Sequence, residues 1–174
     1  MCWVTLYPLS FRDILKEMNR RYDRKYFEEK VIEIRKLRPG ISLSTDVIVG
    51  FPGETDKDFE DTLEFCKKIG FSKIHVFPYS DRDGTVASRM KNKIPGNIKK
   101  DRVHKLIALS NELESNYFES FIDKEVEVLI EEEKDGYYYG FTDNYIPLKL
   151  KGNYKINDIY KVKLNKNDIN FDMN

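Results

Sequence analysis

The stretch from Ile41 to Thr55 constrains the fold of this 174-residue chain more than any other segment. Residues 41–49 are mostly apolar or β-branched, which predicts a short strand buried on both faces of a parallel sheet. A Gly-Phe-Pro-Gly sequence at 50–53 ends the strand, and Thr55 can cap a following helix together with Asp58. Strand, glycine turn and capped helix mark the carboxyl end of a parallel strand, where α/β folds bind ligands. A purely structural turn fits the same residues equally well.

The neighbouring segments predict an alternation of strands and helices. Apolar spacing and end signals indicate helices at 12–18, 23–37 and 56–69, and short strands at 3–9 and 72–77. The order β-α-β-α-β is typical of parallel strands joined by right-handed crossovers. Three such units leave an open strand edge. We therefore expect the chain to be truncated at its start, with the pairing partner of its first strand missing.

Charge is unevenly distributed along the chain. Lysine and arginine balance aspartate and glutamate overall, with 30 residues of each kind. Residues 1–110, however, carry 22 basic against 16 acidic residues, and residues 111–174 carry 8 against 14. The chain is therefore charge-segregated, and the glycine turn lies in its basic part.

The cysteine content argues against a disulfide framework and against a metal site. Cys2 and Cys66 are the only cysteines, and Cys66 falls on the predicted inner stripe of a helix with Phe59 and Leu63. This pattern predicts a reduced, cytoplasmic protein. No apolar run approaches the roughly 20 residues that a membrane span needs, so no membrane partner is expected.

A charged loop at 80–97 precedes a long helix, for which Asn97 is the predicted cap. The apolar stripe of this helix is predicted to contain Val103, Leu106, Ile107, Ser110, Leu113, Tyr117 and Phe121. Its first turns carry Lys99, Lys100, Arg102 and Lys105, where cations oppose the helix macrodipole. Either these residues form a solvated face or an anionic partner lies close to them.

From Lys124 onward the hydrophobic period changes to two. Strands are predicted at about 124–131, 137–141, 145–150 and 159–164, separated by turns at 134–136, 143–144 and 152–153. This pattern predicts a small β-barrel of the oligonucleotide-binding (OB) kind. Tyr137, Tyr138 and Tyr139 cannot all face inward, because neighbours on a strand point to opposite faces. An outward tyrosine is either a stacking surface for a base or a cover over the core.

These motifs together resemble the radical-SAM methylthiotransferases that modify tRNA. The resemblance rests on Asp46–Thr55, on His-Val-Phe-Pro-Tyr-Ser at 75–80, on Arg82 and Ala87, and on strands similar to the RNA-binding TRAM domain. The sequence at 140–146 is most similar to the branch that acts on threonylcarbamoyladenosine. The resemblance covers about residues 13–165.

The resemblance implies a fold and its limits. It implies the C-terminal half of a partial radical-SAM (βα) barrel, an α/β structure, over residues 1–97. A linking helix would follow at 98–119, and a TRAM-like, OB-like β-barrel at 120–174.

The resemblance also implies a reaction. The family uses two [4Fe–4S] clusters and S-adenosylmethionine to add a methylthio group to C2 of adenosine 37. Residues matching the cofactor-binding positions are Asp46, Ile48, Gly50, Glu54, His75, Phe77 and Tyr79. The cysteine loop of the radical-SAM cluster is absent, and clusters need thiolate ligands. We therefore assign no catalytic or metal residue and expect no cofactor to bind tightly to this chain alone.

The RNA-binding prediction combines basic residues with the tyrosine run. The predicted contacts to the tRNA anticodon stem-loop are Arg82, Lys99, Lys100, Arg102, Lys105, Tyr137, Tyr138, Tyr139, Lys149 and Lys151. The segment 82–105 holds 8 basic against 2 acidic residues, so it is expected to supply most of the attraction for phosphate.

Three hypotheses stay open from the sequence. The chain is part of a tRNA methylthiotransferase, completed by a separate N-terminal half that carries the clusters. Alternatively, it is a non-catalytic RNA-binding module that retains the TRAM domain. A third hypothesis is an unrelated α/β enzyme, but neither His75 nor His104 lies in a triad or metal-binding pattern.

Overall fold

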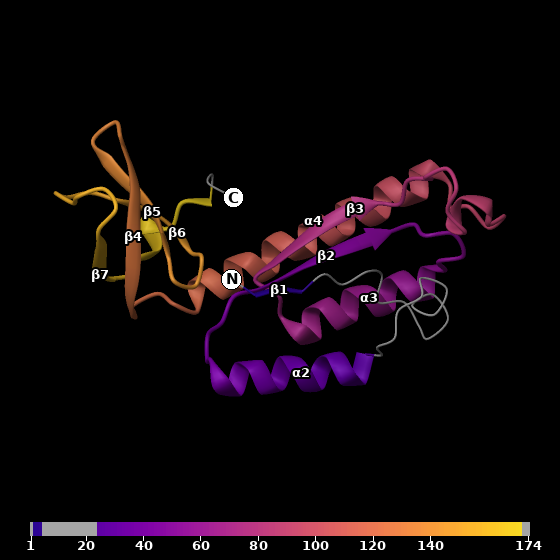
Figure 1. Ribbon diagram of the computed structural model, residues 1–174, viewed down its shortest axis with the longest axis horizontal. Coiled ribbons are helices and arrows are strands. Elements are labelled where there is room, and N and C mark those ends of the chain that lie inside the picture. Colours follow the sequence, from indigo (N-terminus) through magenta and orange to yellow (C-terminus); the bar gives the residue numbers. More distant parts are fainter. Residues whose placement is uncertain (1, 5–23, 172–174) are drawn as a thin grey trace. The chain divides into compact units, whose positions relative to one another are not determined.

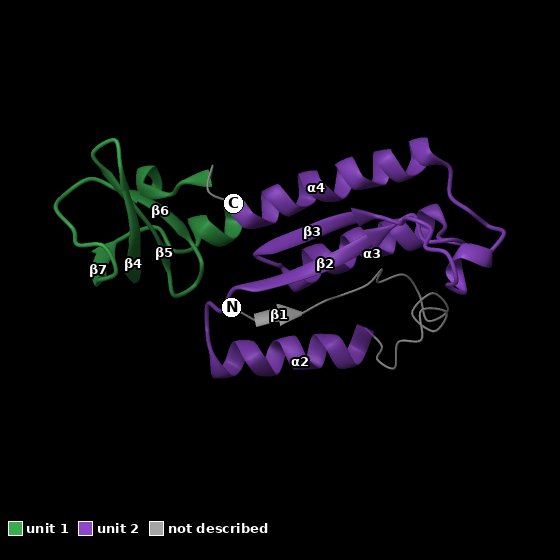
Figure 2. Ribbon diagram, turned by 45° about the horizontal axis from the view of Figure 1, so that its top comes forward, with its two compact units in different colours: residues 1, 115–174 green, residues 2–114 purple. Residues whose placement is uncertain are grey.

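A computed structural model describes residues 2–4 and 24–171 of the chain. Two compact units make it up, one of residues 2–114 and one of Met1 with residues 115–174 (Figure 2). The division falls inside the long helix α4, which spans Gly96–Glu119. The predicted helix at 12–18, the proposed cap Asp23 and most of the predicted first strand lie outside the described residues.

The first unit contains a parallel three-stranded sheet in the order β1-β2-β3 (Figure 1). Its elements are β1 (Cys2–Val4), α2 (Arg24–Leu37), β2 (Leu43–Val49), α3 (Asp56–Ile69), β3 (Lys73–Pro78) and the beginning of α4. A single 3-10 turn, η1 (Ala87–Arg89), lies in the loop before α4. The predicted α/β alternation is confirmed.

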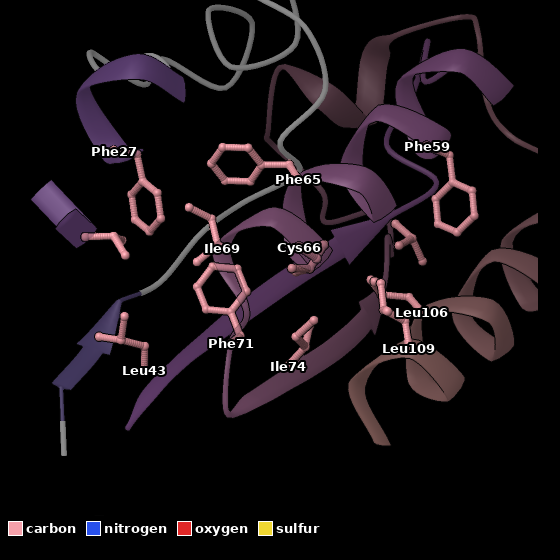
Figure 3. Packing of buried hydrophobic residues seen from close by; sticks show 13 residues of the cluster. Phe27, Leu43, Phe59, Phe65, Cys66, Ile69, Phe71, Ile74, Leu106 and Leu109 are labelled. Carbon is pink, nitrogen blue, oxygen red and sulfur yellow. The ribbon is translucent and has the colours of Figure 1, made fainter. Parts of the chain in front are cut away.

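The core of this unit lies between the helices and one face of the sheet (Figure 3). Val47 and Val49 of β2 are fully buried on this face, and side chains from α2, α3 and α4 belong to the same cluster, among them Phe27, Cys66 and Leu106. The alternate residues of β2 point to the opposite face. Ser44 on this face is buried, whereas Asp46 and Ile48 are partly exposed, so a ligand can reach the sheet at the carboxyl end of β2.

The turn after β2 folds as its residues predict. Thr55 and Asp58 form a reciprocal capping box at the start of α3, and Gly70 ends the helix in the left-handed conformation. Phe59 and Cys66 are buried as expected, whereas Leu63 is only partly buried.

Two predictions about α4 are wrong. The helix begins at Gly96, so Asn97 lies within it and is not its cap. Ile107 is exposed and Leu109 is buried, because the buried stripe follows Arg102, Leu106, Leu109 and Ser110. The stripe starts at a buried arginine, which an apolar pattern cannot identify.

The second unit is built on a four-stranded antiparallel sheet in the order β6-β5-β4-β7. The strands are β4 (Glu125–Lys134), β5 (Tyr137–Thr142), β6 (Pro147–Leu150) and β7 (Ile159–Lys163), and the 3-10 turn η2 (Lys166–Asp168) follows. Alternate residues of β4 are buried in one cluster with Phe118 of α4 and with Phe121, which follows the helix. The sheet is consistent with the predicted OB-like barrel.

The β4–β5 hairpin has a tight turn and a bulge. Asp135 and Gly136 both have positive φ, of 54° and 74°, as a two-residue type I′ turn requires. The register shifts between Ile130 and Glu132, so Glu131 is the extra residue. A Cβ on Gly140 would lie 2.9 Å from the Leu129 carbonyl carbon and closer still to its oxygen. Only glycine therefore allows β5 to approach β4 here.

We predict that Gly140→Ala destabilises the second unit by about 1–3 kcal/mol, the usual cost of overpacking a rigid backbone contact. Urea unfolding followed by circular dichroism measures this change. Gly96→Ala is the matched control, because a Cβ there meets nothing within 4 Å. Equal stability of the two variants would contradict the proposed close approach.

Candidate functional site

A pocket of about 480 Å³ lies at the carboxyl ends of β2 and β3. Its walls include four of the predicted cofactor-binding residues, Asp46, Ile48, Phe77 and Tyr79. Ile48 and Phe77 are direct neighbours across the two strands, so their side chains share one face of the sheet. The pocket combines an apolar floor with Asp46 and the basic Arg82 at its walls.

The other three predicted cofactor-binding residues do not line this pocket. His75 pairs with Asp46 in the sheet register, next to the pocket. Gly50 and Glu54 belong to the turn behind it, and both are buried. Glu54 therefore shapes the turn and does not present its carboxylate to a ligand.

Glu54 holds the glycine turn together from inside. Its side chain is 1% exposed, and its Oε2 accepts a hydrogen bond of 2.6 Å from the backbone N–H of Gly50. Gly50 has a φ of +74°, a left-handed conformation that favours glycine. Burial raises the pKa of Glu54, although the Gly50 amide and the charge of Arg102 oppose this effect.

Arg102 on α4 is the counter-ion of Glu54, which corrects its predicted role. Its side chain is 4% exposed, and Nη1 donates to Oε2 of Glu54 at 2.5 Å and to the Glu54 carbonyl at 3.2 Å. Nη2 donates to the carboxylate of Asp56 at 2.7 Å. A guanidinium buried in this way cannot meet a phosphate, so we remove Arg102 from the predicted RNA contacts.

Lys99 ties the turn after β2 to the strand end of β3. A Cβ on Gly50 would lie 2.6 Å from Cδ of Lys99 and closer still to its Cγ, so the lysine stem lies directly over the glycine. Its Nζ donates to the carbonyl of Tyr79 at 3.1 Å. We call Lys99 and Arg102 the α4 clamp, since both hold the strand ends that form the pocket.

The clamp explains the cations at the start of α4. For Arg102 the anionic partner is within the chain, namely the carboxylates of Glu54 and Asp56. Lys99 instead donates to a neutral backbone carbonyl. Sequence reasoning missed this pairing, although the basic helix start was its signal. Lys105 also has an internal partner, Asp101 at 2.8 Å, and this hydrogen bond raises the pKa of Lys105.

Arg82, Lys100 and Lys105 are the exposed members of the predicted basic set in the first unit. Arg82 lines the pocket at the end of β3. Nearby, the Tyr79 hydroxyl donates to Asp81 at 3.0 Å, and Lys93 also pairs with Asp81. The hydrogen bond from Lys93 lowers the pKa of Asp81, which therefore stays ionised as the acceptor for Tyr79.

In the second unit, the structure separates the three neighbouring tyrosines. Tyr138 packs toward the core, edge-on to Tyr154 with ring centroids 5.4 Å apart. Tyr137 and Tyr139 lie on the other face beside Lys149, whose Nζ is 4.2 Å and 5.8 Å from their ring centroids. Lys151 also approaches Tyr137, at 5.8 Å. We call these four residues the Tyr–Lys surface; Tyr138 is not part of it.

The residues present do not fit an iron–sulfur cluster. Cys66 is buried in the core, and burial raises its pKa to about 12, so it is held as the neutral thiol and not as a thiolate ligand. Among the described residues, no three His, Cys, Asp or Glu side chains are grouped to hold a metal ion. No step of a reaction can therefore be assigned to a cluster on these residues.

Comparison with known proteins confirms the predicted resemblance. Residues 2–66 match the model of the Radical SAM superfamily. Threonylcarbamoyladenosine tRNA methylthiotransferase MtaB of Bacillus subtilis (strain 168) is 42% identical over 159 residues, which are 88% of this chain and 35% of that protein. The tRNA-2-methylthio-N(6)-dimethylallyladenosine synthase of the same strain is 39% identical over 156 residues, 87% of this chain and 31% of that protein. The chain spans about a third of the length of these relatives.

A solved structure shows the same fold over part of the chain. Coproporphyrinogen III oxidase (HemN) from Escherichia coli, a radical SAM enzyme, superposes with a TM-score of 0.53 and 21% identity, covering 64% of this chain and 26% of that one. In the described part of the present chain, no helix has the length and apolar character needed to cross a membrane.

Replacing Arg102 by Met is expected to destabilise the first unit by about 3–5 kcal/mol at pH 7.5, the usual cost of leaving a buried charge unpaired. The double variant Glu54→Gln/Arg102→Met should recover part of this loss, because glutamine keeps the acceptor for Gly50 without the charge. Denaturant unfolding of both variants and the wild type measures the difference. A double variant no more stable than the single one would contradict the pairing.

The cost of Arg102→Met should also depend on pH. Because burial raises the pKa of Glu54 above its ordinary 4.5, folding favours the protonated form. The contribution of this pKa shift to the free energy of unfolding is fully present below pH 4.5. It is lost as the pH rises through the pKa of Glu54 in the folded protein. Removing Arg102 raises that pKa further, so the variant should be less destabilised at pH 4.5 than at pH 7.5. The same cost at both values would show that Glu54 is not the group affected.

Proposed function

We propose that this chain, which is similar to tRNA methylthiotransferases over most of its length, supplies two parts of a radical-SAM tRNA-modifying activity. The first part is the adenine side of the S-adenosylmethionine pocket at the ends of β2 and β3. The second is an RNA-contacting face on the antiparallel sheet. The proposed reaction is addition of a methylthio group to C2 of modified adenosine 37, with N6-threonylcarbamoyladenosine as the substrate.

The pocket fits the apolar and planar part of such a cofactor. Ile48 and Phe77 supply an apolar floor, and Tyr79 adds an aromatic ring held by its bond to Asp81. The α4 clamp fixes the backbone on which these side chains stand. In the family, S-adenosylmethionine supplies the radical and the methyl group; the residues of this chain would bind and orient its adenine side.

Cluster chemistry must come from residues outside this sequence, because Cys2 and Cys66 cannot supply three thiolates. We propose a separate N-terminal half that carries the cysteines. The observation that supports such an N-terminal half is the similarity to a methylthiotransferase over 88% of this chain.

The Tyr–Lys surface supports the RNA-binding part of the proposal. It lies on β5 and β6, the second and third strands of the sheet in chain order, and in OB-folds this is the face that binds oligonucleotides. Lysine ammonium groups beside partly exposed tyrosine rings offer both phosphate attraction and base stacking. Arg82 and Lys100 are proposed as additional phosphate contacts.

A second candidate function is a non-catalytic RNA-binding module. The burial of Cys66 and its raised pKa favour this candidate, because this thiol is not available for chemistry. Both candidates need the Tyr–Lys surface. They differ in whether an N-terminal partner forms an active complex with the chain.

Binding of a tRNA anticodon stem-loop at several salt concentrations tests the RNA face. Lys149→Ala and Lys151→Ala should each reduce the salt slope by roughly 0.7–0.9, the counterion-release increment. Tyr139→Ala should weaken binding without changing the slope. Lys155→Ala is the control, since Lys155 is an exposed lysine of the same unit that pairs with Asp158. An effect of the control as large as that of Lys149→Ala would overturn the assignment.

The proposal of a separate N-terminal half that carries the clusters can be tested by anaerobic reconstitution with iron and sulfide. We expect no stoichiometric cluster on this chain alone, and a cluster-bearing complex when a cysteine-rich N-terminal half is co-expressed. Absorbance of a [4Fe–4S] centre on the isolated chain would refute this division of roles. Failure of any N-terminal half to form a complex would favour the non-catalytic module.

A further inference from the structure

A second concave site lies on the same outer face of the antiparallel sheet as the Tyr–Lys surface. It has a volume of about 270 Å³ and lies where β4, β5 and β7 meet. Leu129 is the direct cross-strand neighbour of both Phe141 and Ile159. Leu129 and Ile159 are 38% and 65% exposed, so this apolar surface is open to solvent.

Two aromatic rings form one wall of this groove. Phe141 and Tyr145 lie with ring centroids 6.3 Å apart and their planes tilted by 47°. Phe141 follows Tyr139 by two residues, so both point outward and are separated by about 7 Å along the strand. A single-stranded RNA whose bases lie along β5 can therefore contact both the Tyr–Lys surface and this groove.

Carboxylates form the rim of the groove. Glu127, Glu131 and Asp143 line it, and Glu131 is the extra residue of the β4 bulge, a feature that re-aims a side chain. These carboxylates repel phosphate. They are nevertheless good acceptors for the amino groups of nucleobases, as in the pairing of Glu or Asp with cytosine N4.

We propose that this groove binds one unpaired nucleobase that bears an exocyclic amino group. The base would stack against Phe141 and Tyr145, and its amino group would donate to a rim carboxylate. Its phosphates would lie toward β6, where Lys149 is the cross-strand neighbour of Tyr139. This inference rests on the proposed RNA-binding function and adds a base preference to it. Uracil, which lacks an amino group, should be the poorest occupant.

The alternative occupant is a basic and apolar protein segment, which an acidic rim would also attract. The groove favours a base for two reasons. One of its walls is formed by two aromatic rings, which suits a flat ring system, and the groove continues the aromatic row of β5. Residues 115–174 carry 8 lysines against 12 carboxylates. RNA can therefore be bound in this unit only where lysines are grouped on the surface, as on β6.

The test uses the full chain and fluorescent pentamers UUXUU, with X as A, C, G or U, at one fixed low salt concentration. We expect the best of the three amino-bearing bases to bind at least about threefold tighter than U. Phe141→Ala should remove this preference and weaken binding of that pentamer by roughly 5- to 150-fold, the effect of losing one stacked base. Phe141→Leu keeps the apolar bulk and should show the same loss of preference.

The carboxylates give an independent readout. At least one of Glu127→Ala, Glu131→Ala and Asp143→Ala should abolish the base preference while strengthening binding of UUUUU, because repulsion of phosphate falls. A merely structural role would weaken all pentamers equally. Ile156→Ala, exposed and outside the groove, is the control and should leave all four affinities unchanged.

Three outcomes would overturn the inference. One is equal affinity for all four pentamers, and another is full preference in Phe141→Ala. The third is binding of a Leu/Lys peptide that Phe141→Ala abolishes while the pentamers are unaffected, which would assign the groove to protein. In each of these cases, stem-loop binding that still depends on Lys149 would leave the proposed RNA-binding function unaffected. If the wild-type chain did not bind the stem-loop at all, the RNA-binding function itself would be refuted.

Discussion

The buried ion pair between Glu54 and Arg102 is the interaction on which the first unit depends. Glu54 accepts from the Gly50 amide, and Arg102 binds the same carboxylate oxygen. The pair thereby fixes a left-handed glycine turn and attaches it to α4. Lys99 extends this attachment to the carbonyl of Tyr79. The pocket walls, Ile48 and Phe77, stand on strand ends that these contacts hold in register.

Much of this fold follows from local sequence signals. The capping box of Thr55 and Asp58, the stop at Gly70 and the two-residue turn at Asp135 and Gly136 are short-range features, and the structure contains each of them. The period-two pattern of β4 likewise places its alternate apolar residues in the core. Signals of this kind depend only on residues close together in the chain.

The misassigned residues depend on contacts between distant segments. Arg102 meets Glu54 across 48 positions, so a basic helix start looked like a phosphate site when read alone. The apolar pattern predicts Ile107 on the buried stripe of α4. The prediction is wrong because the stripe includes Arg102, and a pattern of apolar residues cannot identify a buried arginine. The alternation of β5 showed that Tyr137, Tyr138 and Tyr139 could not share a face, but only the strand pairing showed that Tyr138 is the inward one.

We propose that RNA binds mainly to the outer face of the antiparallel sheet, with Arg82 and Lys100 as additional phosphate contacts. The most direct measurement is a titration of the isotope-labelled chain with an anticodon stem-loop, followed through backbone amide resonances. We expect the largest shifts at Tyr137, Tyr139, Lys149 and Lys151, and small ones at Arg102 and Lys105. Shifts concentrated at residues 99–105, with an unchanged sheet, would contradict this proposal.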